Sequence, residues 1–165
     1  ELAHFYHGAR SANAATSEEE AWIHEGGAEA FAALALRMFG EVAYVNRRIG
    51  AASDRCAAGL AKLSDKPLVA AARLGAFDLY YDCGLLLQLA IDGELRRNSG
   101  GRETLATLWA DFLDRTRAGA PWTGETFLAT ARARGLTEPT ARRIADLAGT
   151  PQHLSAGALR ALLAL

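Results

Sequence analysis

One segment, Ala76 to about Arg97, is more hydrophobic than a helix on a protein surface can be. Its apolar residues follow helical spacing but cover more than one side of the helix. They are Phe77, Leu79, Tyr80, Leu85, Leu86, Leu87, Leu89 and Ile91. Such a helix must be covered by other elements, so we expect it at the centre of the fold. The polar and glycine-rich segment 98–101 ends it.

Amphipathic helical patterns occur on both sides of this segment, and turn residues separate them. The expected helices run from Ser17 to Gly40, Glu41 to about Leu63, Pro67 to about Gly75, Glu103 to Arg117, Thr123 to about Arg134, Thr137 to about Gly149, and Ser155 to the end. No run shows the alternation typical of strands. We therefore predict an all-α, single-domain helical bundle spanning residues 1–165. The helix carrying Trp22 to Met38 should pack against the one carrying Phe77 to Ile91, because these two are the most apolar.

Composition narrows the class of protein. A chain of 165 residues has the length of one domain with one sizeable core. Its formal net charge of -1 provides no basic excess to neutralise phosphates, which argues against nucleic acid as a partner. Polar residues interrupt every apolar run before it reaches membrane-spanning length. Arg47 and Arg48 are interpreted as part of a solvated helix face.

The chain contains two cysteines, Cys56 and Cys83. They could form a disulfide or remain two buried thiols. Two cysteines without metal-binding spacing favour buried free thiols, and the disulfide stays as the alternative.

The first four residues, Glu1-Leu2-Ala3-His4, are four fifths of an H-E-x-x-H sequence. A histidine in front of Glu1 would complete it. Two histidines four residues apart share one face of a helix and can bind one zinc ion, with the glutamate beside the metal-bound water. Catalytic zinc sites have three protein ligands and a fourth position for water. Glu25, about one helix and a loop further along, is the natural third ligand.

Two further segments extend this pattern. Trp22-Ile23-His24-Glu25-Gly26 matches W-x-x-E-G, and Tyr81-Asp82-Cys83-Gly84 is similar to Y-x-K-G with a cysteine in place of the lysine. With H-E-x-x-H, these motifs resemble the gluzincin metallopeptidases, in particular the aminopeptidase N and glycyl aminopeptidase branches. The resemblance covers about the first two thirds of the chain. The interval between His4 and Glu25 looks a residue or two longer than in aminopeptidase N.

The resemblance implies a role for each matched residue. His4 and Glu25 would bind Zn2+ together with the histidine before Glu1, Glu1 would act as general base, and Tyr81 would stabilise the oxyanion. It also implies a fold: the helical lobe of a thermolysin-like catalytic domain, which faces an upstream mixed α/β lobe of the same protein. The substrate would be a peptide. An aminopeptidase is favoured, although the motif that would recognise a free amino terminus is not in this sequence.

We expect that the chain is part of a longer protein and that it has no peptidase activity and no stoichiometric zinc by itself. A non-enzymatic helical interaction or scaffold domain, or a degenerate peptidase lobe, is the alternative. His24 and Glu29 could contact the metal ligands or the substrate, although His24 is more typical of a structural residue. His7 is also interpreted as structural. Tyr80 is expected in the core. If Tyr81 is catalytic, its hydroxyl should lie within about 10 Å of the Glu25 carboxylate and should line a cleft.

Overall fold

The computed structural model describes residues 18–165, and these residues form helices without any strand. The α-helices are α2 (Ala21–Met38), α3 (Val42–Lys62), α4 (Leu79–Ser99), α5 (Leu105–Arg117), α6 (Gly124–Ala133), α7 (Glu138–Gly149) and α8 (Ala156–Leu163). A short 3-10 turn, η1 (Glu18–Glu20), precedes α2. The all-α prediction is therefore confirmed. Within the described part of the chain, no helix is both long and apolar enough to cross a bilayer.

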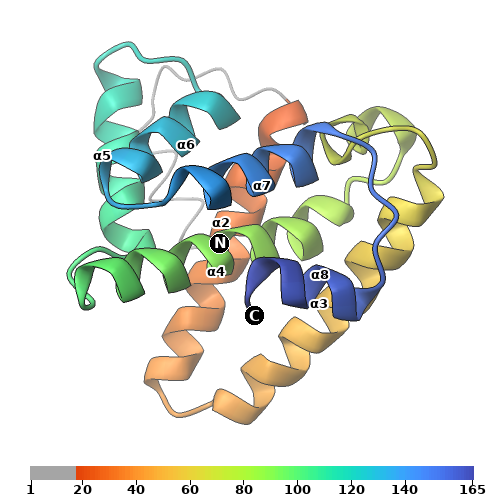
Figure 1. Cartoon of the computed structure of the whole chain (residues 1–165), viewed down its shortest axis with the longest axis horizontal. Coiled ribbons are helices and arrows are strands. Elements are labelled where there is room, and N and C mark those ends of the chain that lie inside the picture. Colours follow the sequence, from red (N-terminus) through yellow and green to blue (C-terminus); the bar gives the residue numbers. More distant parts are fainter. Residues whose placement is uncertain (1–17) are drawn as a thin grey trace.

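Helix α4 is the centre of the bundle, as its apolar pattern predicts. It packs against α2, α3, α5 and α8. In Figure 1 it crosses the middle of the view, with α5 and α6 at the upper left and α3 and α8 at the lower right. Its most extensive partner is α2, so the predicted packing of these two helices is also confirmed.

The segment between α3 and α4 differs from the prediction of a short helix. It forms two 3-10 turns, η2 (Leu68–Ala70) and η3 (Ala72–Leu74), and α4 begins at Leu79 instead of near residue 76. Tyr80 holds these turns in place. Its buried hydroxyl donates a hydrogen bond to Val69 O at 2.9 Å and accepts one from Ala72 N at 3.3 Å. Tyr80 is therefore the core tyrosine that the sequence predicts.

Threonines at two predicted helix starts behave differently. Thr123 precedes α6, and its hydroxyl accepts a hydrogen bond from Thr126 N, as expected of an N-cap. Thr137 precedes α7 but does not cap it in this way. Instead its backbone N–H donates to the Glu94 carboxylate, which also accepts a hydrogen bond from Thr140 Oγ1. A carboxylate from α4 thus accepts a hydrogen bond from the backbone N–H at the start of α7 and links the two helices.

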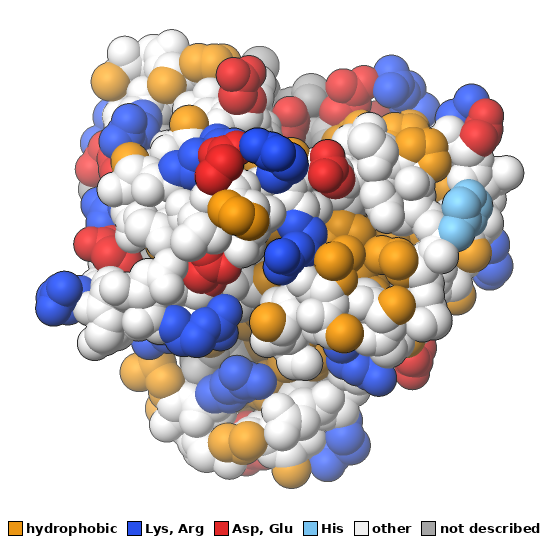
Figure 2. Space-filling model, viewed as in Figure 1, with side chains coloured by type: hydrophobic (Ala, Val, Ile, Leu, Met, Phe, Trp, Pro, Cys, Tyr) orange, Lys and Arg blue, Asp and Glu red, His pale blue; other side chains and the backbone are white. Residues whose placement is uncertain are grey.

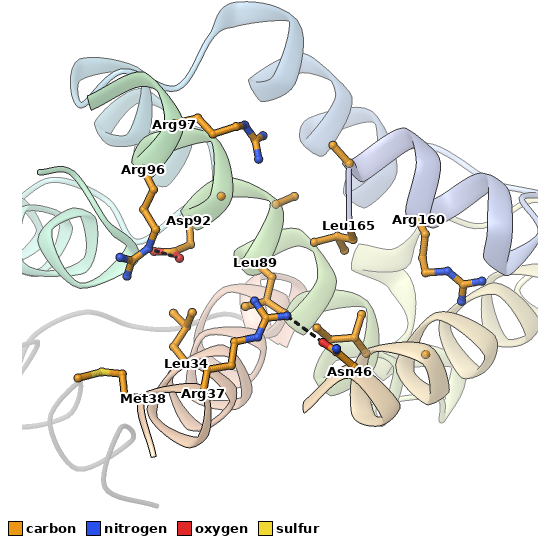
Figure 3. Close-up of a pocket in the computed structure, with 15 residues that line it drawn as sticks. Leu34, Arg37, Met38, Asn46, Leu89, Asp92, Arg96, Arg97, Arg160 and Leu165 are labelled. Atoms are coloured by element: carbon orange, nitrogen blue, oxygen red, sulfur yellow. Dashed lines mark hydrogen bonds and ion pairs between the residues drawn. The ribbon is translucent and has the colours of Figure 1, made fainter. Parts of the chain in front are cut away.

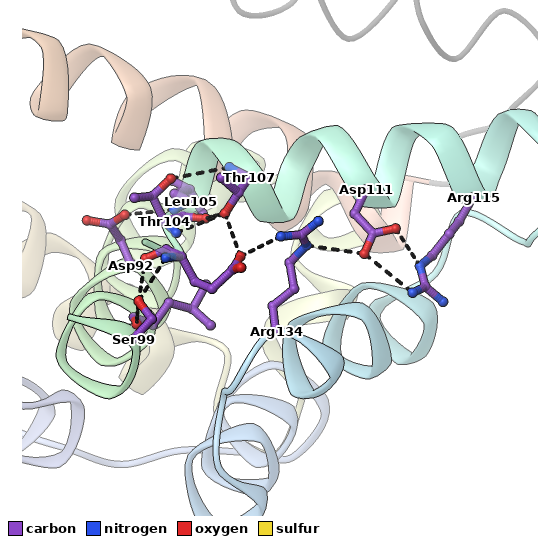
Figure 4. A network of polar contacts seen from close by, with 10 residues as sticks. Asp92, Ser99, Thr104, Leu105, Thr107, Asp111, Arg115 and Arg134 are labelled. Carbon is purple, nitrogen blue, oxygen red and sulfur yellow. Dashed lines mark hydrogen bonds and ion pairs between the residues drawn. The ribbon is translucent and has the colours of Figure 1, made fainter. Parts of the chain in front are cut away.

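A second carboxylate of α4 orders the start of α5. Asp92 is buried, and its Oδ1 accepts a hydrogen bond from Leu105 N at 2.7 Å. Its Oδ2 accepts another from Arg96 Nε at 2.6 Å. Arg134, at the end of α6, forms ion pairs with Glu103 and Asp111 from the other side of α5 (Figure 4). These contacts fix α5 between α4 and α6.

Candidate functional site

The candidate site lies where α2 crosses α4. The two helices meet at Gly26 and Gly84, the glycines of the W-x-x-E-G and Y-x-K-G-like segments. A Cβ atom at Gly26 would lie 2.3 Å from the carbonyl carbon of Gly84, and one at Gly84 would lie 2.6 Å from Trp22 O. Gly27, next along α2, is covered by the Trp109 ring, whose Cζ2 would lie 2.5 Å from an added Cβ. The two helix backbones are therefore in direct contact at Gly26 and Gly84.

This crossing places Glu25 and Tyr81 side by side. Glu25 precedes the crossing glycine of α2 by one residue, and Tyr81 precedes that of α4 by three. A side-chain hydrogen bond joins the Tyr81 hydroxyl and the Glu25 carboxylate. The sequence-based prediction that the two groups lie within about 10 Å is confirmed. The cleft that Tyr81 is expected to line and the catalytic roles of both residues stay predictions.

The electrostatic surroundings keep Tyr81 protonated. Burial raises the pKa of the Tyr81 phenol, and the negative charge and hydrogen bond of Glu25 raise it further. Glu25 is only 8% exposed, and His24 Nε2 lies 3.2 Å from its Oε1. The Glu25 carboxylate is therefore surrounded by a phenol and an imidazole in the part of α2 that the motif predicts.

A network of charged side chains extends from this pair, and it was not predicted. Arg48 on α3 donates hydrogen bonds to Glu29 Oε2 and to Asp82 Oδ1, each at 2.7 Å. Arg55, two turns further along α3, donates to both oxygens of Asp82 at 2.7 and 2.8 Å. The interpretation of Arg48 as a solvated residue is therefore wrong, because the arginine links α2 to α4 beside Tyr81. The seven-residue spacing of Arg48 and Arg55 places them on one helix face, which is the signal that could have identified them.

The network controls the protonation of Asp82. Burial would raise the pKa of this carboxyl group, but hydrogen bonds and positive charge from Arg55 and Arg48 outweigh burial and lower the pKa below its ordinary value. The Asp82 side chain is 9% exposed, so its two arginine partners compensate a charge that is almost fully removed from water. Asp82 is therefore ionised over the physiological pH range.

The two cysteines form a disulfide, so the preference for free thiols is wrong. Cys56 on α3 and Cys83 on α4 are both buried, and their Cα atoms lie 5.1 Å apart. The bridge closes a loop with a sequence separation of 27 residues. Two cysteines on different helices meet only if those helices pack with the right rotation, which their spacing in the sequence does not reveal. The disulfide fixes α3 against α4 directly beside Asp82 and Gly84.

The other predicted site residues are divided between two regions. Glu1 and His4, with the predicted structural residue His7, lie outside the described residues. Within residues 18–165, no group of three His, Cys, Asp or Glu side chains is arranged to hold a metal ion. Of the predicted ligands and catalytic residues, Glu25 and Tyr81 are therefore the two whose positions in the structure can be compared with the prediction. The neighbouring His24 and Glu29 are also described.

Comparisons with known proteins add no relative. No protein-family model, no curated protein and no solved structure matches the chain. The resemblance to gluzincin peptidases therefore rests on the three short motifs of the sequence.

Proposed function

We propose that this chain is the helical lobe of a gluzincin-type zinc peptidase. The observation that carries the proposal is the contact between Glu25 and Tyr81. Two motifs more than fifty residues apart in the sequence meet at a glycine-to-glycine crossing, and their ligand and oxyanion residues become neighbours. A general helical bundle has no need to bring these two residue types together.

The donor set around Glu25 suits a zinc ligand. A carboxylate beside a phenol and an imidazole provides an oxygen donor with polar neighbours that can orient it. In the proposed enzyme, Glu25, His4 and a histidine before Glu1 would hold the ion. When bound, zinc would polarise the scissile carbonyl group and activate a water molecule.

The residues of the chain would then have separate tasks. Glu1 would accept the proton of the attacking water and deliver it to the amine that leaves. Tyr81 would donate a hydrogen bond to the oxyanion, and its raised pKa keeps it a donor at neutral pH. Arg48 would hold Glu29 and Asp82, which follow Glu25 and Tyr81 on their respective helices. The peptide would lie between this lobe and an upstream α/β lobe, and cleavage at the amino terminus is the favoured specificity.

The test begins with the codon that precedes Glu1, for which we expect histidine. A protein that includes this residue and the upstream lobe should bind one zinc ion per chain, measured by atomic emission. Glu25→Gln should abolish stoichiometric zinc, whereas Glu29→Gln, on the same helix and ion-paired to Arg48, should retain it. A residue other than histidine before Glu1, or full zinc content in Glu25→Gln, would reject the assignment.

A non-enzymatic interaction domain is the second candidate, because the described surface includes very exposed apolar residues. Met38 and Phe39, at the turn between α2 and α3, are 88% and 84% exposed. Large apolar side chains this accessible at adjacent positions are typical of contact surfaces. Peptidase activity and binding by this turn are compatible, since the turn lies at the opposite end of α2 from Glu25.

A further inference from the structure

A second site lies at the other end of α2. The C-terminal half of α2, the start of α3, the second half of α4 and the end of α8 surround a hollow of about 950 Å³. Arg37, which lines it, is twelve residues from Glu25 along α2, a separation of about 18 Å at 1.5 Å per residue. The hollow is therefore separate from the candidate catalytic residues.

Positive charge dominates the lining of this hollow. Among the charged side chains that line it, four are arginines, Arg37, Arg96, Arg97 and Arg160, and one is an aspartate, Asp92. Asp92 is buried and already accepts a hydrogen bond from Arg96 (Figure 3) and another from Leu105 N at the start of α5 (Figure 4), so it offers no negative surface. The space-filling view shows basic side chains between α4 and the α2–α3 hairpin below it (Figure 2).

Three of the arginines have no carboxylate within ion-pairing distance among residues 18–165. They are Arg37, Arg97 and Arg160, and they come from α2, α4 and α8. Figure 3 shows Arg37 and Arg97 on opposite sides of the space, with Leu165 between them and Arg160 at its edge. The guanidinium of Arg97 lies along Gly93, where an added Cβ would be 3.2 Å from its Nη1. Positive groups spread around a rim fit several separated anions better than a single phosphate.

The floor of the hollow is apolar. Leu34, Ile49 and Leu89 line it, and Met38 and Leu165 continue it toward solvent. A nucleic acid would present phosphates without a matching apolar surface, and the net charge of -1 for the whole chain gives it no general attraction. A flexible peptide segment could place carboxylates on the arginines of the rim and an aliphatic or aromatic side chain on the apolar floor.

We propose that this hollow binds an acidic peptide segment, with its carboxylates on Arg37, Arg97 and Arg160 and an apolar side chain on the apolar floor. The segment belongs to a partner protein. The site does not depend on the peptidase proposal, because it contains none of the proposed catalytic or metal-binding residues.

The experiment measures the fluorescence anisotropy of a labelled peptide of glutamate, leucine and glycine with the 165-residue chain. Solvent-exposed ion pairs are individually weak, so we expect a dissociation constant on the order of 10–100 µM. Raising NaCl from about 0.05 M to about 0.5 M should weaken binding severalfold. A peptide with lysine in place of glutamate, or glycine in place of leucine, should not bind measurably.

Variants locate the site. Arg37→Glu, Arg97→Glu and Arg160→Glu should each weaken binding about tenfold, equal to a change of about 1.4 kcal/mol. Met38→Ser should weaken it severalfold, and the exposure of Met38 makes a folding defect unexpected. Arg102→Glu is the matched control, since this exposed arginine lies outside the hollow and should leave binding unchanged.

Three outcomes would overturn the proposal. The first is that the three arginine-to-glutamate variants bind the peptide as tightly as the unaltered protein does, when circular dichroism shows that they are folded. The second is displacement of the peptide by millimolar inorganic phosphate, which would indicate a site for small anions. The third is arginine-dependent binding to phosphatidylserine vesicles without binding to the peptide, which would indicate a membrane surface.

Discussion

Gly26 and Gly84 face each other where α2 crosses α4, and neither has room for a single methyl group. The contact is between backbones: a Cβ at Gly26 would lie 2.3 and 2.4 Å from the carbonyl carbon and Cα of Gly84. Because no flexible side chain is involved, neither partner can give way by changing a rotamer. The position of Glu25 relative to Tyr81 follows from this crossing.

The crossing predicts the sign of two glycine substitutions. Alanine in a helix interior is favoured over glycine by about 1 kcal/mol. At Gly84 the backbone clash should exceed this gain, so Gly84→Ala should lower the free energy of unfolding by about 2–4 kcal/mol. At Gly50, within α3, an added Cβ meets nothing within 4 Å, so Gly50→Ala should stabilise the protein by up to about 1 kcal/mol. Urea unfolding followed by circular dichroism measures the free energy of unfolding of both variants. If the two substitutions changed it by the same amount, the close contact at Gly84 would be contradicted.

The sequence predicts the helices and the α2–α4 contact well because both depend on local or very strong signals. Helical spacing of apolar residues identifies α2 to α8, and the excess of leucine in α4 places it at the centre. The Glu25–Tyr81 contact could be predicted only through the motif resemblance, since the two residues are on different helices. The α2–α4 contact and these helix assignments are therefore the parts of the fold that a reader could derive from the sequence.

The features that the sequence did not reveal are long-range ones. The ion pairs of Arg48 and Arg55 with Asp82 join residues 34 and 27 positions apart. The Cys56–Cys83 bridge also joins two helices, and the rotation of α3 against α4 decides whether the two cysteines meet. At Thr137, the local capping signal is present, but Glu94 of α4 takes over the role. In each case a side chain from another helix decides the outcome.

Asp82 predicts a specific dependence of stability on pH. Its pKa is lowered from 3.8 in the folded protein, so the ionised form stabilises the fold. This contribution is fully present above the ordinary pKa and is lost as the pH falls through the lower, folded-state pKa. Asp82→Asn should therefore lower the free energy of unfolding by about 2–3 kcal/mol at pH 7, and the difference should shrink as the pH falls toward about 2.

Urea unfolding of both proteins across this pH range measures the effect. Asp65→Asn is the matched control, because the side chain of Asp65 is 79% exposed and its pair with Lys66 lies on the surface. It should leave stability unchanged at pH 7. A difference between Asp82→Asn and the unaltered protein that stays constant down to about pH 2 would contradict the role of the two arginines.

The disulfide predicts a measurable loss of stability on reduction. Closing a loop with a separation of 27 residues reduces the entropy of the unfolded chain, which corresponds to about 3–4 kcal/mol. Protein recovered from an oxidising compartment should show no free thiol after unfolding in guanidinium, as measured by alkylation and mass spectrometry. Reduction should then move the urea midpoint to a lower concentration. Two alkylated cysteines in the oxidised preparation would contradict the bridge.

Comparing Tyr81→Phe with Tyr80→Phe separates a catalytic role of Tyr81 from a structural one. In the complete peptidase proposed here, Tyr81→Phe should retain zinc but lower kcat by about 10²–10³, as the loss of one oxyanion donor does in other hydrolases. Tyr80→Phe removes a hydroxyl whose hydrogen-bond partners within residues 18–165 are the η2–η3 turns, so it should cost about 1 kcal/mol of stability and leave kcat nearly unchanged. The two variants change the same chemical group at adjacent positions of one helix. Equal turnover by the two folded variants would show that the Tyr81–Glu25 contact serves the α2–α4 interface and not the reaction.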